Sequence, residues 1–174
     1  YKATPVHLAG KTMVKVVAAG PLLGIVRITR MLNRSRLEQD IVLGADSRRV
    51  EFRTRIDWRE KHKLLKVNFP TAIHATEAIH EIQFGHLRRP THASRPFDAD
   101  RFEVSNHKWT ALAEENRGVA LLNDCKYGIN VEGGSINLTL LRSPLAPDMR
   151  ADQGPQEFTY AFHAWTGTFF ESDL

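Results

Sequence analysis

Regular alternation of apolar and polar side chains is the feature that most constrains how this chain can fold. From Arg49 to Asp57, every second side chain is apolar or a threonine, and the side chains between them are charged. Successive side chains of a strand point to opposite faces of a sheet, so this pattern predicts a half-buried antiparallel strand. Helical periodicity is hard to find in the sequence, and we therefore expect sheets to form the core.

Nine further segments show similar but less regular strand patterns. They are Met13–Val17, Leu23–Met31, Leu37–Leu43, Leu64–Phe69, Ile79–Leu87, Lys108–Leu112, Val119–Asn123, Ile136–Leu141 and Phe158–Phe162. Turn residues such as Gly20-Pro21 and Gly133-Gly134 separate them, and two longer loops are expected at Arg88–Asp100 and Ser143–Gln156. About ten strands without intervening helices predict an all-β fold, an antiparallel β-sandwich.

Composition narrows the class of protein. With 174 residues, 42% hydrophobic and 25% charged, the chain has the length and balance of one soluble globular domain. No apolar run approaches the roughly 20 residues that span a bilayer, so we expect no membrane partner. The net charge of +4 is spread along the chain, which disfavours nucleic acid. Cys125 is the only cysteine, which favours a reducing compartment.

The run from Gly118 to Gly128 is a candidate site. It begins as an apolar strand and ends in an amide, a carboxylate, an ammonium and a phenol, contributed by Asn123, Asp124, Lys126 and Tyr127. Such an exit can present polar groups at the rim of a cleft. It can also be a turn in which the Asn and Asp side chains bind local backbone, and the residue types alone favour the turn.

Two other strand ends carry possible binding groups. The exit from His86 to His92 contains Arg88 and Arg89, whose forked guanidinium groups can bind carboxylate, phosphate or vicinal hydroxyls. A solvated loop paired with nearby Asp residues is the simpler interpretation. Arg142 ends an apolar strand just before an acidic loop, where an internal salt bridge and a substrate-facing role are equally compatible with the sequence.

Complete catalytic machinery is absent from these patterns. None of the eight His residues forms a tight metal-binding motif, and His80 or His86 is expected to be a core histidine. Nothing marks a base for Cys125. A glycosidase needs two facing carboxylates, and Asp124, Asp148 and Asp152 have no context that indicates a nucleophile.

Several segments nevertheless resemble, in order, the C-terminal β-domain of the class II α-mannosidases, glycoside hydrolase family 38, of the cytosolic and bacterial type. The resemblance spans at least residues 13 to 163. It rests on Asp57-Trp58, Lys63 to Val67, Glu81 to His92, Arg101 to Val104, His107 to Trp109, Gly118 to Gly128, Leu140 to Pro144, Ala146 to Asp148, Ala151 to Gly154 and Glu157 to Ala161.

The resemblance implies retaining hydrolysis of terminal α-linked mannose from oligosaccharides. It also implies that the nucleophile, the acid/base and a divalent metal, zinc or cobalt, lie in an N-terminal catalytic half that this sequence lacks. Residues 1–174 would then form an incomplete part of a galactose-mutarotase-like supersandwich, and this part would be inactive alone. Residues implied to line the active-site wall without binding metal are Arg142, Lys126, Tyr127, Asp124, His86, Arg88 and Arg89.

The resemblance further suggests a cytoplasmic enzyme and allows a homo-oligomer. Two other interpretations stay open. The chain could be an autonomous sugar-binding sandwich, which would need an exposed aromatic platform from Trp58, Trp109 or Trp165. It could also be a purely structural interface domain, whose polar rim residues bind only one another.

Overall fold

Antiparallel strands form nearly all the regular structure in the computed structural model, which describes residue 6 and residues 10–174. The chain divides into two units that we describe separately. The first unit comprises Tyr1–Leu65 with Leu141–Thr159, and the second comprises Lys66–Leu140 with Tyr160–Leu174. Within the described residues, no helix is long and apolar enough to cross a bilayer. The predicted all-β class with antiparallel sheets is confirmed.

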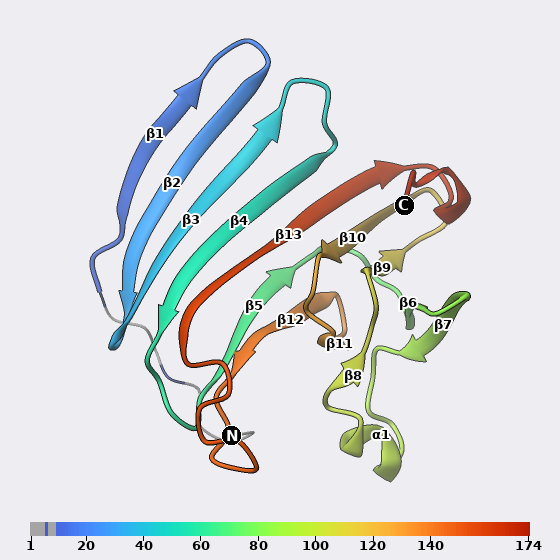
Figure 1. Cartoon of the computed structure of the whole chain (residues 1–174). Helices are drawn as coiled ribbons and strands as arrows, with labels where there is room; N and C mark the ends of the chain where they lie inside the picture. Colours follow the sequence, from blue (N-terminus) through green and yellow to red (C-terminus); the bar gives the residue numbers. More distant parts are fainter. Residues whose placement is uncertain (1–5, 7–9) are drawn as a thin grey trace. The chain divides into compact units, whose positions relative to one another are not determined.

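The first unit is built on long neighbouring strands (Figure 1). They are β1 (Met13–Ala19), β2 (Leu23–Leu32), β3 (Ser35–Gly44), β4 (Arg49–Trp58) and the opening part of β13 (Gly154–Thr166). Tight connections join β1 to β2, β2 to β3 and β3 to β4 as antiparallel pairs. The segment with the most regular alternation is therefore a strand, as predicted.

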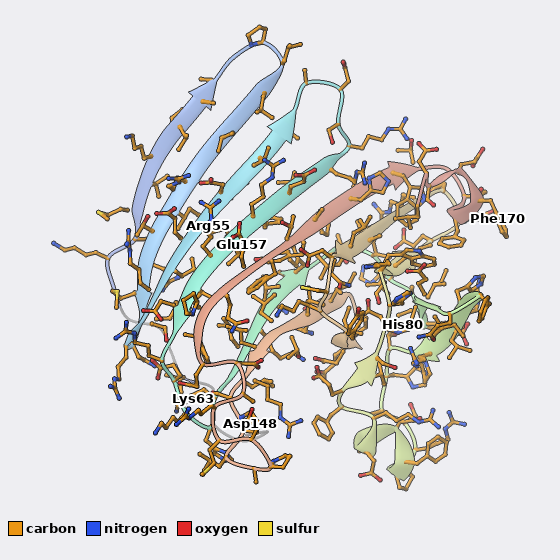
Figure 2. The ribbon with its side chains drawn as sticks, viewed as in Figure 1. Arg55, Lys63, His80, Asp148, Glu157 and Phe170 are labelled. Carbon is orange, nitrogen blue, oxygen red and sulfur yellow. The ribbon has the colours of Figure 1, made fainter. Side chains whose placement is uncertain are left out.

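Register in the first unit separates the two faces of its strands. Asp40 on β3 lies opposite Arg27 on β2, and the guanidinium binds the carboxylate through two hydrogen bonds of 2.7 Å. Figure 2 shows Arg55 and Glu157 side by side on the same unit, with 3.2 Å between Nε and Oε1. The opposite face is mainly apolar, since Ile41 lies between Val26 and Phe52, and it also carries the hydrogen-bonded pair Gln39 and Thr54. The alternating charges thus form a solvated ladder of ion pairs.

The second unit contains shorter strands arranged in two sheets. Its elements are β5 (Leu64–Pro70), β6 (Glu77–Ile82), β7 (Gly85–Pro90), α1 (Pro96–Asp100), β8 (Val104–Ser105), β9 (Trp109–Ala113), β10 (Arg117–Asn123), β11 (Gly128–Glu132), β12 (Ser135–Arg142) and the 3-10 turn η1 (Phe169–Glu171). The ends of β5, β12 and β13 reach into the first unit. One sheet runs β13-β10-β9-β6-β7 and the other runs β5-β12-β11-β8.

These two sheets pack face to face within the second unit. The ring of Phe69 on β5 stacks on Phe162 of β13 with 5.2 Å between centroids, and it meets Tyr160 edge-on at 6.2 Å. Leu121 on β10 and Ile136 on β12 are at most 1% exposed. Burial of apolar side chains between two sheets is the basis of a β-sandwich, and the predicted architecture holds for this unit.

The aromatic C-terminal segment is packed on its own chain. Phe169 of η1 contacts the rings of Trp109 and Trp165 at 5.7 and 6.4 Å between centroids. Figure 2 marks Phe170 at the outer side of this turn, where 91% of the side chain is exposed. The chain thus folds back over Trp165 and Phe169 and covers these aromatics itself.

The expected strand Ile79–Leu87 is wrong, because the structure has a hairpin there. Strand β6 ends at Ile82 and β7 begins at Gly85, with Phe84 in the turn at φ 67° (Figure 1). A positive φ is unusual for an aromatic residue, so the sequence carried little sign of a turn. The short strands β8 and β11 and the one-turn helix α1 also lay outside the predicted segments.

Candidate functional site

Arg142 lies at the last position of β12 in the first unit and is exposed. Its backbone N–H donates a 2.5 Å hydrogen bond to the Asp152 carboxylate. The next residue, Ser143, is 2% exposed, and its N–H and carbonyl bind the backbone of Lys63 and His62. These contacts fix the strand end on both sides, so the Arg142 side chain starts from a well-held backbone.

A cavity of about 250 Å³ adjoins this strand end. Arg142 and Lys63 contribute cationic groups to its lining, while Leu64, Pro144 and Leu145 contribute apolar surface. Apolar surface with a few placed polar groups is the usual composition of a small-molecule site. The arrangement can bind hydroxyl or anionic groups, and no carboxylate belongs to its lining.

The acidic loop after Arg142 serves local structure. Asp152 accepts the hydrogen bond from the Arg142 backbone, and Asp148 accepts one of 2.8 Å from the Arg150 backbone N–H. Figure 2 labels Asp148 on this loop together with Lys63 on the nearby connection. Both carboxylates thus cap turns. This is the role of turn residues and gives no sign of a glycosidase nucleophile.

The Asn123–Tyr127 corner of the second unit divides into a buried anchor and outward groups. Asn123 is 8% exposed. Its side-chain Nδ2 donates to Asn106 Oδ1 at 3.1 Å, and its side-chain Oδ1 accepts from the Lys126 backbone N–H at 2.7 Å. The turn interpretation is therefore correct for Asn123. Asp124, Cys125 and Tyr127 are exposed and Lys126 is partly exposed, so the residues after Asn123 reach the surface.

Tyr127 is half exposed and stacks on the ring of His107, with 5.8 Å between centroids. Both rings line a shallow cavity with Glu81 and Gln83. The Tyr127 carbonyl accepts hydrogen bonds from the backbone N–H and the side-chain amide of Asn106. Sequence analysis did not select His107, because its stacking partner lies twenty residues further along the chain.

The candidate residues on β7 do not share one face. His86 packs against Trp109 and Phe169 at 6.5 and 5.9 Å between ring centroids. Arg88 pairs with Glu77 of β6 at 3.9 Å. Arg89 follows on the opposite face and reaches a separate cavity, so the predicted cluster of His86, Arg88 and Arg89 is divided by the pleat of the strand.

His80 is a core histidine of the second unit, in agreement with the prediction that His80 or His86 would be one. It is 1% exposed, and its Nδ1 lies 3.0 Å from the Thr110 hydroxyl. Burial, with a smaller effect of Arg89, lowers the pKa of His80 to about 4. The imidazole is therefore neutral at pH 7 and serves as a packed polar group.

No group of three His, Cys, Asp or Glu side chains that could hold a metal occurs among residues 6 and 10–174. His7 lies outside the described residues. Burial, followed by a hydrogen bond with Asp124, raises the pKa of Cys125. A raised pKa disfavours the thiolate, so this exposed cysteine is a poor nucleophile at neutral pH.

Comparison with a protein-family model gives a match over most of the chain. The model of the glycosyl hydrolases family 38 C-terminal domain matches residues 1–150. Human Alpha-mannosidase 2C1 is 51% identical over 140 residues, which cover 80% of this chain and 14% of that protein. Alpha-mannosidase G of Dictyostelium discoideum is 45% identical over 159 residues, which cover 88% of this chain and 15% of that protein.

Solved structures show the same fold. An alpha-mannosidase from Enterococcus faecalis V583 superposes with a TM-score of 0.82 at 16% identity, covering 91% of this chain and 22% of that one. A second glycosyl hydrolase family 38 protein from Enterococcus faecalis gives 0.76, covering 92% of this chain and 23% of that one. The chain thus spans about one seventh of the length of the two curated relatives named above.

Proposed function

The chain belongs to the glycosyl hydrolases family 38 C-terminal domain family, and from this membership we propose that it is the β-domain portion of an α-mannosidase. The whole enzyme would hydrolyse terminal α-linked mannose from oligosaccharides. The single observation that carries the proposal is the match of residues 1–150 to the family model. Identity of 51% with a curated α-mannosidase supports the same activity.

In this proposal the segment supplies a wall of the active site and leaves the bond-breaking chemistry to another part of the protein. The carboxylates of Asp148 and Asp152 already accept backbone hydrogen bonds in turns, which argues against a nucleophile here. Arg142 is the first choice for a substrate contact, because its strand end is held in place and borders a cavity. Lys126 and Tyr127 are the next choices.

The retaining mechanism and the metal belong to the same proposal. Retention needs a carboxylate nucleophile and an acid/base about 5 Å apart, and both would come from the N-terminal catalytic half. Zinc or cobalt would bind in that half as well, since the described residues offer no suitable group of ligands. The proposal further includes a cytoplasmic location and assembly of several copies. The lone Cys125 supports the cytoplasmic location, because a single cysteine is typical of a reducing compartment, and it says nothing about assembly.

An autonomous sugar-binding module is less well supported. Such a module presents exposed aromatic rings, but Trp58 and Trp165 are 3% and 4% exposed. Trp109 is partly buried against Phe169. The three indoles thus serve packing. A purely structural role for the rim would require that removing Arg142 leave hydrolysis unchanged.

Hydrolysis of an aryl α-mannoside tests the proposal. We expect no turnover by the 174-residue chain with zinc or cobalt supplied. We expect metal-dependent turnover by a longer protein that joins this chain to the N-terminal half of its family. Lack of α-mannosidase activity in the longer protein would refute the proposed activity, while turnover by the chain alone would refute the division of roles.

A further inference from the structure

A cavity in the second unit, separate from the one beside Arg142, has no part in the proposed function. Its volume is about 500 Å³, and its lining comes from the end of β7, from α1 and from β11. A volume of this order suits a small organic molecule. Arg89, Arg101 and His80 bring basic side chains to this lining, together with the amide of Asn130.

We propose that this cavity binds a small organic anion, whose phosphate or carboxylate group is held between Arg89 and Arg101. Binding here goes beyond the proposed hydrolysis and does not depend on it. The shared chemistry of the two anions is a planar or tetrahedral group of oxygens, which guanidinium forks bind through paired hydrogen bonds.

Arg89 is a partly buried cation without an acidic partner. Its Nη1 donates to the backbone carbonyl of Ser105 at 3.1 Å, and no carboxylate of the described residues lies within ion-pair distance. Burial, followed by repulsion from Arg101, lowers the pKa of Arg89. Arg89 in turn disfavours the charged form of His80. Arg89 and His80 therefore both experience a positive electrostatic potential, which a bound anion would lower.

Arg101 forms no ion pair within 4 Å among the described residues, although its charge contributes to lowering the pKa of the nearby Asp98 carboxyl. Its guanidinium lies 5.0 Å from the centre of the Phe97 ring, which orients the cation without neutralising it. Asp98 lines the same cavity, but its carboxylate already accepts hydrogen bonds from the backbone and the guanidinium of Arg95. Glu132, on the exposed end of β11, is the other acid of the lining.

Calorimetric titration at constant ionic strength tests the proposal on the 174-residue chain. Inorganic phosphate, acetate and glucose 6-phosphate serve as anionic probes, and glucose serves as the uncharged probe. We expect saturable binding of at least one anion and none of glucose. Tighter binding of glucose 6-phosphate than of phosphate would identify an organic phosphate as the ligand, and preference for acetate would identify a carboxylate.

Substitutions locate the binding. Arg89→Gln and Arg101→Gln should each weaken anion binding at least tenfold. Arg88→Gln is the matched control, because Arg88 is the preceding residue of the same strand, carries the same charge and pairs with Glu77. Circular dichroism checks that each variant folds. If Arg89→Gln does not fold, Arg101→Gln still tests the proposal, because Arg101 is exposed and its substitution should not disturb the core.

Amide chemical shifts provide a second readout, since bound anion should perturb residues of β7, α1 and β11 first. The proposal would be overturned if no anion bound at about 10 mM, since a dissociation constant above that concentration is weaker than that of ordinary small-molecule sites. It would also be overturned if Arg101→Gln bound the anion as tightly as wild type, or if Arg88→Gln weakened binding as much as Arg89→Gln. Because every readout is binding, failure here leaves the proposed mannosidase role untouched.

Discussion

The indole of Trp165 lies directly on Gly118, its partner across the β10–β13 pair. A Cβ atom added at Gly118 would stand 2.1 Å from Cζ2 of that ring, far inside van der Waals contact. The missing side chain at position 118 therefore makes room for an indole that is 4% exposed and joins Ile79, Ala111 and Ala120 in one cluster.

Gly118→Ala should lower the free energy of unfolding by about 1–3 kcal/mol, the usual cost of overpacking a core. Chemical denaturation followed by tryptophan fluorescence measures the change. Gly85→Ala is the matched control, because a Cβ there meets nothing within 4 Å, and its effect should stay within about 0.5 kcal/mol. Equal stability of the two variants would show that Trp165 moves aside freely.

Arg142→Ala, made in the longer active protein, should lower kcat/KM for an aryl α-mannoside by roughly tenfold or more. One charged hydrogen bond to the transition state is worth about 2 kcal/mol. Arg59→Ala is the control, since Arg59 is exposed and pairs with Asp57 in the same unit. A kcat/KM within about twofold of wild type, with an unchanged melting temperature, would remove Arg142 from the active-site wall.

His80 should make stability depend on pH below neutrality. Its pKa of about 4 lies below the ordinary value of 6.5, so between these values the unfolded chain binds a proton that the folded protein does not. Stability should therefore fall as pH drops through this window, by on the order of 3 kcal/mol from this group. NMR titration of the His80 ring checks the cause, and protonation near pH 6.5 in the folded protein would contradict it.

Asp40 should also lose its stabilising contribution on acidification, but in a more acidic range than His80. The hydrogen bonds from Arg27 hold the pKa of Asp40 below its usual value, so its contribution is present above the unfolded pKa of about 4 and is lost as pH falls further. Asp40→Asn should thus be less stable than wild type at pH 7 and equal to it near pH 2. Denaturation at both pH values measures this, and a difference that persists unchanged into acid would show a packing effect.

Strand positions with regular alternation were predictable because the side-chain period of a sheet acts locally. Arg49–Asp57 lies within β4, and the turn at Gly133 lies where glycine makes φ of +55° available. The hairpin at Phe84 was not predictable in the same way, since an aromatic residue in the left-handed region is stabilised only by the pairing of β6 with β7.

Site residues were predictable as candidates, but their grouping was not. Arg88 and Arg89 are adjacent in sequence, yet one pairs with Glu77 and the other lines the large cavity. Arg101, which lines the same cavity as Arg89, was not among the candidate site residues, because that cavity is assembled from separate elements. Sequence spacing alone cannot show which side chains converge from different strands.

The sequence by itself determined the all-β class, the charged and apolar faces of the first unit and the family resemblance, because each is written in local pattern or in ordered motifs. Tertiary structure decided which polar groups are buried and which are available. Asn123 became an anchor, His80 a neutral core group and Arg89 a cation facing a cavity. Burial and electrostatic potential arise from atoms that are distant along the chain, so only folding assigns these roles.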